Sequence, residues 1–327
     1  TMGLNFTVDE AHEQFVIRSS HVIIGISLPA NLLTVYLLWR KTPNSIGHYK
    51  YLLIMLQSCS ALIDLHLGVF FMPVPLFPLI GCYCKGMLCE AHVPPHISVV
   101  IFFFLVLGCL VTLFFCIFYR HQVILPAHHK LKLRKNRYKI ILFSLYAITW
   151  ETMSLLILIS DNVSNGKSDY LEKEQPAMIW LTSKDSWVVY DTDSSIRFVV
   201  YYVLIVSFSL EQMLSSRIVF RHTTRYFEVA DMSSRTLAFH RAMMKSLMMQ
   251  ALCWLLVVAP VAVLSASVLL ESIPHEMISV AFLVAQLFSV VHAQTVIANS
   301  PTLRQSVLSY FGFICTTGST KMKALKM

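Results

Sequence analysis

The stretch SALIDLHLGVFFMPVPLFPLIG, residues 60–81, carries an aspartate and a histidine inside an apolar run. A carboxylate and an imidazole that face one pocket can transfer protons between them. Asp64 and His66 are only two residues apart, so their side chains point about 200° away from each other in a regular helix. The spacing excludes a simple Asp64–His66 dyad, and each residue needs its own interpretation.

The carboxylate of Asp64 lies about 13 residues from the start of its apolar run, a distance of about 20 Å at 1.5 Å per residue. A carboxylate so deep in a membrane is costly unless it is protonated, paired or hydrated. We therefore expect Asp64 to face the protein interior. Two interpretations stay open. Asp64 belongs to an internal polar network, with water or a cation, that rearranges between two packings, or it is a static carboxylate bonded to Ser, Asn or backbone groups.

Three further titratable residues fall inside apolar runs. Glu151 lies near the middle of the fourth apolar run, residues 138–160, and is a candidate to line a cavity. Glu211 lies near the inner end of the fifth apolar run, residues 198–214, where it could pair with Arg217 or Arg120. For both acids, a paired structural role competes with contact to a ligand. His292, in the seventh run, is either an interior hydrogen-bonding residue or a functional one.

Two residues are candidates for a conformational switch. Arg120 ends the third apolar run, where it either reaches the cytosolic face as a functional arginine or serves only as a topogenic charge. Pro260 interrupts the sixth run, and an interior proline frees a carbonyl group and kinks a helix. Such a kink could act as a pivot for the inner half of that helix.

Three prolines, Pro73, Pro75 and Pro78, follow the second apolar run within six residues. They cannot donate backbone hydrogen bonds, and each disfavours helix at the residue before it. We therefore predict that the second helix ends near Met72 and that PVPLFPLIG forms an extended, apolar rim. Termination of the helix competes with ligand contact as the purpose of this rim.

The cysteines favour a disulfide over a metal site. Cys82, Cys84 and Cys89 cluster in a predicted extracellular segment, which allows one disulfide and leaves one thiol. Cys315, after a short amphipathic stretch, is a candidate for palmitoylation. Four others lie within apolar runs, where free cysteine behaves as a small apolar residue. They are Cys59, Cys109, Cys116 and Cys253.

No sequence pattern supports catalysis. We find no nucleophile elbow, phosphate loop, zinc helix motif or pair of catalytic carboxylates. The chain is therefore expected not to be an enzyme and to need no cofactor or metal.

The elements that must position these residues are membrane helices. The chain has 327 residues, of which 56% are hydrophobic and 13% charged, with a mean hydropathy of +0.64. A helix needs about 20 mostly apolar residues to cross a bilayer. Seven runs qualify as helices, and the whole chain is predicted to form one all-α domain of seven transmembrane helices with a cytoplasmic tail at 299–327. The runs are 22–39, 51–71, 97–119, 138–160, 198–214, 246–270 and 277–298.

The distribution of charge orients this bundle with its N-terminus outside. Most of the 26 lysine and arginine residues then fall in the cytoplasmic segments. Both glycosylation sequons, at Asn5 and Asn162, fall outside. The polar first 18 residues do not resemble a cleavable signal peptide, so we expect the first helix to direct insertion. The formal net charge of +8 is explained by this bias and by attraction to anionic lipid, so no nucleic-acid partner is expected.

The segment KTPNSIGHYKYLLIMLQSCSALIDLHLGVFFMPVPLFPLIGCYCKGML, residues 41–88, resembles the signature of nematode serpentine chemoreceptors of the Str superfamily. It is most similar to class I (Sri) and next to class H (Srh). Weaker similarity continues through FYRHQ, KSLMMQALCWLLVVAP and NSPTLRQ. In the last of these, Leu303 stands where those receptors usually have a tyrosine before the arginine.

The resemblance implies a G-protein-coupled receptor fold and a chemosensory function. It implies a small-molecule chemical ligand bound among the outer halves of the helices and a heterotrimeric G protein at the inner face. The long outer loop at 161–197 would shape the entrance, and the receptor would span the plasma membrane, with sensory neuron cilia as its location. A channel or transporter, and an orphan seven-span protein without signalling, are the alternatives.

Overall fold

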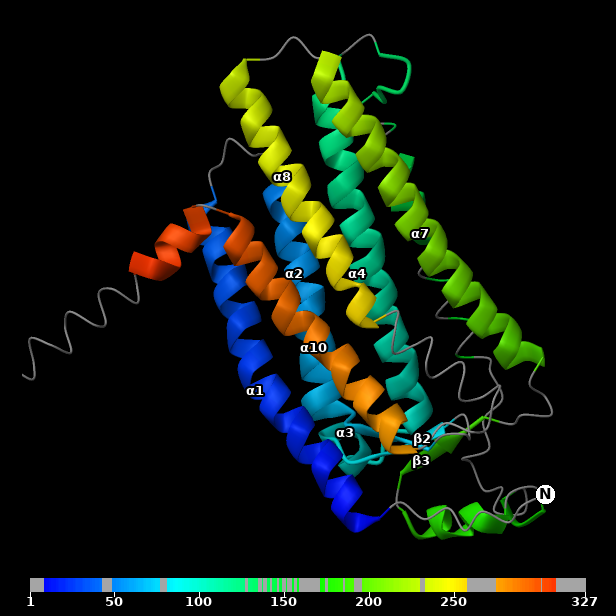
Figure 1. Cartoon of the computed structure of the whole chain (residues 1–327). Coiled ribbons are helices and arrows are strands. Elements are labelled where there is room, and N and C mark those ends of the chain that lie inside the picture. The colour runs from blue at the N-terminus through cyan, green and yellow to red at the C-terminus, as the bar shows by residue number, and fades with distance from the viewer. Residues whose placement is uncertain are drawn as a thin grey trace, which may run out of the picture.

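The computed structural model describes most of the chain (Figure 1). The described residues are 9–42, 49–76, 81–126, 129–134, scattered positions between 137 and 158, 171–173, 176–184, 186–190, 196–229, 233–257, 275–300 and 302–309. Asn5, Asn162, Pro260 and Cys315 lie outside these residues, so the predictions that concern them stay predictions.

Long helices make up most of the described structure. Figure 1 shows them running side by side, with the strands at the end where α1 begins. The long helices are α1 (Glu10–Lys41), α2 (Tyr49–Leu65), α4 (Pro95–Ile124), α7 (Ile196–Val229), α8 (Ser234–Cys253) and α10 (His275–Asn299). Shorter elements are η2 (His66–Phe70), α3 (Met87–Glu90), η3 (Pro176–Ser183), and the strands β1 (Pro73–Pro75), β2 (Gly81–Cys84) and β3 (Trp187–Val189).

Four helices among the described residues are long and apolar enough to cross a membrane. They cover the predicted runs 22–39, 51–71, 97–119 and 277–298, and they extend over Glu10–Lys41, Tyr49–Phe70, Pro95–Ile124 and Glu276–Asn299. The structure bears out an all-α membrane bundle, because helices supply most of its main buried core.

The packing of the long helices brings distant parts of the chain together. α1 packs against α2 and α10, α2 against α4, α4 against α7 and α8, and α8 against α10. The buried core that joins them is mostly Leu, Ile, Tyr and Cys. The interior polar residues of α1, α2 and α10 are therefore close enough to contact one another.

Two helices continue beyond the apolar runs that predicted them. α7 extends to Val229, whereas its run ends at 214, and α8 begins at Ser234, whereas its run begins at 246. Apolar content marks the part of a helix that lies in lipid, but a helix can continue as long as its residues favour it. The inner ends of α7 and α8 therefore reach past the predicted membrane boundary.

The second helix ends through a π-helical turn. Residues His66–Phe70 form η2, in which the Phe71 amide donates to the His66 carbonyl at 2.7 Å. Met72 then adopts a positive φ of 45°, and the next residue, Pro73, starts a strand. The predicted end near Met72 agrees with this geometry, because the residue before a proline is kept out of the helical region.

A small antiparallel sheet covers the outer end of the bundle. We call it the outer sheet; its strand order is β1-β2-β3. Val74 pairs with Tyr83, and Tyr83 also lies opposite Trp187. β1 carries two prolines and lies at the edge, where missing N–H donors are tolerated. Gly81 allows β3 to approach, because a Cβ atom there would lie 2.5 Å from the Val188 carbonyl oxygen.

Candidate functional site

The carboxylate of Asp64 is the centre of a buried network that joins three helices. Asp64, only 6% exposed, accepts hydrogen bonds from Asn31 Nδ2 in α1 and from Ser289 Oγ in α10, both at 2.7 Å. Asn31 Nδ2 also donates to Ser289 Oγ, and Gln57 Nε2 of α2 donates to the side-chain oxygen Oδ1 of Asn31. We call these four residues the Asp64 network. They satisfy an interior carboxylate with polar groups from α1, α2 and α10.

The imidazole of His66 lies apart from this network. Its Nε2 atom is 2.8 Å from the Ser98 carbonyl oxygen of α4, and its ring packs 5.6 Å from that of Phe71. Asp64 therefore contacts α1 and α10, whereas His66 contacts α4. Their different neighbours agree with the exclusion of an Asp64–His66 dyad.

A second cluster lies between α8 and α10. His292 is fully buried, and neither ring nitrogen has a hydrogen-bond partner among the described residues. Its ring stacks on Phe288 at 5.4 Å, and Phe288 in turn lies 4.6 Å from the ring of Trp254. We call these three residues the α8–α10 cluster. His292 is one helical turn from Ser289, so α10 connects this cluster to the Asp64 network.

Trp254, which contacts Phe288, is a residue of this cluster that the sequence pattern did not single out. α8 ends at Cys253, Trp254 forms a turn, and helix resumes at residues 255–257. The Trp254 amide donates to the Ala251 carbonyl at 3.2 Å, in a tight i−3 pattern. A tryptophan six residues before Pro260 in an apolar run was the available signal, and the helix is already interrupted there.

The guanidinium of Arg120 forms a third cluster at the inner end. Arg120 is 3% exposed, and its Cζ atom lies 3.6 Å from the ring centroid of Tyr49 in α2. The ring of Phe239 in α8 is 6.0 Å away. We call these three residues the Arg120 cluster. Within the described structure, Arg120 Nε and Nη2 are buried without a hydrogen-bond partner, and the ring of Tyr49 offers the guanidinium a cation–π contact.

The structure corrects the predicted pairing of Glu211. No ion pair joins Glu211 to Arg120 or Arg217, and both Glu211 and Arg217 are exposed. Glu211 lies on the face of α7 that also presents exposed Leu214 and Ile218. The side chain therefore points away from the interior position of Arg120.

Glu151 lies on an exposed part of its helix in the structure. Its side chain is exposed, on the helical face that it shares with Ile148, Leu155 and Leu158. These three apolar side chains are exposed as well. Midspan position could not show which face carried the acid, because the whole run is apolar.

At the outer end, the disulfide joins Cys84 and Cys89, and Cys82 is a free thiol. The sequence allowed any of the three pairings. The loop at 161–197 has no cysteine and is held to α4 without a covalent bond. The hydroxyl oxygen of Tyr190, just after β3, lies 2.9 Å from His96 Nδ1 of α4. The Ser186 carbonyl accepts from the Cys84 amide at 3.1 Å.

Burial raises the pKa of the Cys82 thiol to about 12, so almost no reactive thiolate forms at neutral pH. We expect a membrane-impermeant maleimide to leave intact receptor unlabelled at Cys82. After denaturation the other free thiols are labelled as well, so Cys82→Ser should carry one label fewer per chain than wild type, as read by a gel shift. Rapid labelling of the native receptor would contradict this burial.

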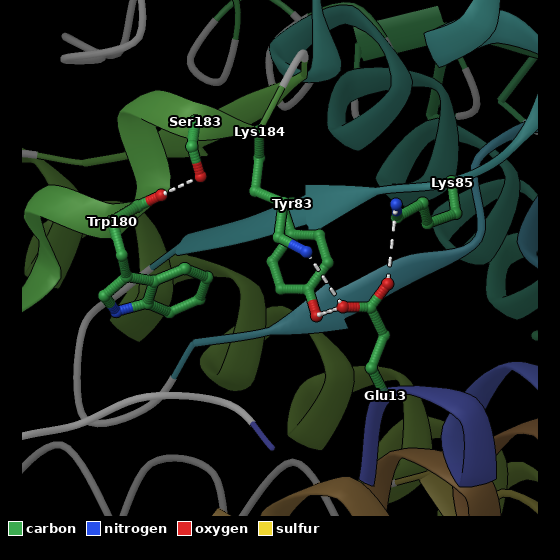
Figure 2. A network of polar contacts seen from close by, with 6 residues as sticks. All are labelled: Glu13, Tyr83, Lys85, Trp180, Ser183 and Lys184. Carbon is green, nitrogen blue, oxygen red and sulfur yellow. Dashed lines mark hydrogen bonds and ion pairs between the residues drawn. The ribbon is translucent and has the colours of Figure 1, made fainter. Parts of the chain in front are cut away.

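A polar cluster fastens the first turn of α1 to the outer sheet (Figure 2). Glu13 accepts from the Tyr83 hydroxyl at 2.8 Å and forms ion pairs with Lys184 at 3.0 Å and Lys85 at 3.5 Å. Burial, followed by the adjacent Glu13 carboxylate, raises the pKa of Tyr83. Tyr83 therefore stays a hydrogen-bond donor at physiological pH.

Glu13→Gln should loosen this attachment, because the variant loses both ion pairs and their charge-assisted hydrogen bonds. We expect at least threefold faster amide hydrogen exchange in the first turn of α1 and in β2, a change of under about 1 kcal/mol. Glu10→Gln, an exposed change in the same turn, is the matched control. Equal exchange in the two variants would contradict a fastening role for Glu13.

In the part of the chain that the structure describes, no group of three or more His, Cys, Asp or Glu side chains is arranged to hold a metal ion. The polar groups present are arranged as buried contacts between helices. Their chemistry suits alternative packings of a bundle, since exchanging one buried partner for another changes which helices are tied together.

Comparison with known families gives one match. The family described as serpentine type 7TM GPCR chemoreceptor Sri matches residues 6–307. No curated protein matches the chain. The matched range includes the Asp64 network, the α8–α10 cluster, the Arg120 cluster and the outer sheet.

Proposed function

Because the chain belongs to the Sri family of serpentine seven-transmembrane chemoreceptors, we propose that it binds a small extracellular molecule and signals to a heterotrimeric G protein. The family is one of receptors rather than enzymes, and its members are membrane proteins with apolar helices, as here. The proposed location is the plasma membrane, in the cilia of sensory neurons.

The observation that carries the proposal is a series of side-chain contacts that runs from the middle of the bundle to its inner end. α10 carries Ser289 of the Asp64 network and His292 of the α8–α10 cluster. α8 leads from Trp254 to Phe239, 15 residues away and about 22 Å along a helix. A displacement of α10 or α8 near the ligand would therefore change contacts at Arg120.

The unpartnered atoms in these clusters supply the bistability that a switch requires. Buried polar groups without partners raise the energy of a packing, so an alternative packing that satisfies them lies close in energy. Arg120 Nε and Nη2, and both ring nitrogens of His292, are such groups. We assign Asp64, His292, Arg120 and Pro260 to this switch, and His66 to the support of α4. Glu151 and Glu211 face outward and have no part in it.

The ligand would bind beneath the outer sheet, among the outer halves of the helices. The sheet is held by noncovalent contacts to α1 and α4, which permits opening without bond cleavage. The inner ends of α7 and α8, which extend past the predicted membrane boundary, offer the surface for the G protein.

Expression in a ciliated sensory neuron or in a heterologous cell with a calcium or cyclic-nucleotide reporter tests the proposal. A panel of small molecules should evoke a signal that requires the receptor and a heterotrimeric G protein. A ligand-gated current that persists without G protein would overturn the proposal in favour of a channel.

A further inference from the structure

A groove between α7 and α8 is not part of the Asp64 network, the α8–α10 cluster or the Arg120 cluster. Its volume is about 440 Å³, and its lining is mostly apolar with two cations. The main lining residues are Phe220, Arg241, Met244, Lys245, Met248 and Met249. This combination of apolar walls and a basic end differs from the interior of the bundle.

The groove opens toward the surroundings of the bundle. Arg241, Lys245, Met248 and Met249 are exposed and follow one another along a single face of α8. Leu252, one turn farther along the same face, is also exposed. In a membrane protein, an exposed apolar face at this depth is in contact with lipid.

The depth of the groove matches the cytoplasmic membrane surface. The apolar run of the sixth span begins at residue 246, so Arg241 and Lys245 lie at its inner boundary. Met248 and Met249 lie about one turn farther into the membrane. The basic end therefore meets the lipid head groups, and the methionine walls meet the acyl chains.

No acidic residue is among the described residues that line the groove, so the charges of Arg241 and Lys245 are available to an anion. Neither residue forms an ion pair with another described residue. The cytoplasmic leaflet carries anionic lipids, and basic pockets between transmembrane helices on that side bind their head groups. Methionine side chains adapt to irregular apolar partners such as acyl chains.

We propose that this groove binds an anionic phospholipid of the cytoplasmic leaflet. Arg241 and Lys245 contact the phosphate head group, and Met248 and Met249 contact one acyl chain. A lipid in this position lies between the inner halves of α7 and α8. Its presence therefore changes the free energy of separating these two helices.

The test uses full-length receptor in phosphatidylcholine nanodiscs that contain a minor fraction of phosphatidylserine, followed by native mass spectrometry of retained lipid. Wild type should retain phosphatidylserine in preference to phosphatidylcholine. Arg241→Gln/Lys245→Gln should lower that retention about 25-fold, from about fivefold for each basic residue removed. This readout is independent of ligand and G protein, so it can fail without affecting the proposed function.

Two further variants separate specific binding from general charge. Lys130→Gln/Arg134→Gln removes the same charge from an exposed inner segment and should leave retention unchanged. Met248→Trp fills the groove while keeping both cations and should also abolish retention. Monodisperse size-exclusion profiles establish that each variant is folded.

Four results would overturn the proposal. One is equal retention of the two lipids by wild type. Another is an equal loss in the two charge variants, which would indicate general attraction to the membrane. The third is displacement of the lipid by soluble glycerophosphoserine at matched concentration, which would indicate a site for free phosphate compounds. The fourth is loss of G-protein binding by Arg241→Gln/Lys245→Gln with unchanged lipid retention, which would assign the groove to the G protein instead.

Discussion

Asp64→Asn should reach the cell surface but lose at least tenfold in ligand potency and show altered basal signalling. Asn31 and Ser289 both donate to Asp64 Oδ2, and the amide oxygen of asparagine can replace that atom, but both bonds then lose the negative charge that strengthens them. Hydrogen bonds between membrane helices contribute about 0.6 kcal/mol on average and up to about 1.7 kcal/mol. A shift of about 1.4 kcal/mol changes a two-state ratio tenfold.

The matched control is Glu211→Gln, which makes the same chemical change on the exposed face of α7. It should leave potency and basal activity at wild-type values. The measurement is a concentration–response curve normalised to surface receptor. Normal trafficking of Asp64→Asn with unchanged basal and evoked signals would show that Asp64 is a static structural carboxylate.

Arg120→Met should separate stability from signalling. The variant removes a buried cation with two unpartnered nitrogens and keeps an unbranched apolar side chain near Tyr49. Replacing buried charges by apolar residues is often neutral or stabilising by about 1–4 kcal/mol, against a cation–π loss of about 2 kcal/mol. The melting temperature should therefore be equal or higher, whereas G-protein activation should fall at least tenfold.

Arg217→Met, an exposed arginine on α7, is the control and should change neither quantity strongly. Thermal unfolding by a thiol-reactive or intrinsic fluorescence assay gives stability, and nucleotide exchange on the G protein gives activation. A large loss of stability in Arg120→Met with proportionate loss of signal would assign Arg120 to structure alone.

The extended rim after the second helix could be predicted, but its partners could not. Pro73 and Pro75 act on their immediate neighbours, so their effect on Met72 and on the helix end can be read locally. The pairing of β2 with β3 joins residues about 100 positions apart, and three-residue strands carry too little pattern to be recognised. The Cys84–Cys89 bond likewise depended on geometry that spacing did not determine.

For the Asp64 network, too, one part could be predicted from the sequence and another could not. The depth of Asp64 required interior partners, and Asn or Ser was among the types considered. That Asn31 and Ser289 supply them depends on the packing of α1 and α10 against α2. For Glu151 and Glu211, the uniformly apolar surroundings gave no amphipathic face, so the direction of the side chain could not be predicted.

The Cys84–Cys89 bond closes a turn only five residues long in sequence and connects no separate element to the bundle. The ties between the outer sheet, α1 and α4 are instead hydrogen bonds and ion pairs. Thiol reductants would therefore open that turn and leave the attachment of the sheet intact. High salt, which screens exposed ion pairs, would weaken the hold of Lys85 and Lys184 on Glu13. The attachment of the outer sheet to α1 is thus sensitive to ionic strength and insensitive to redox conditions.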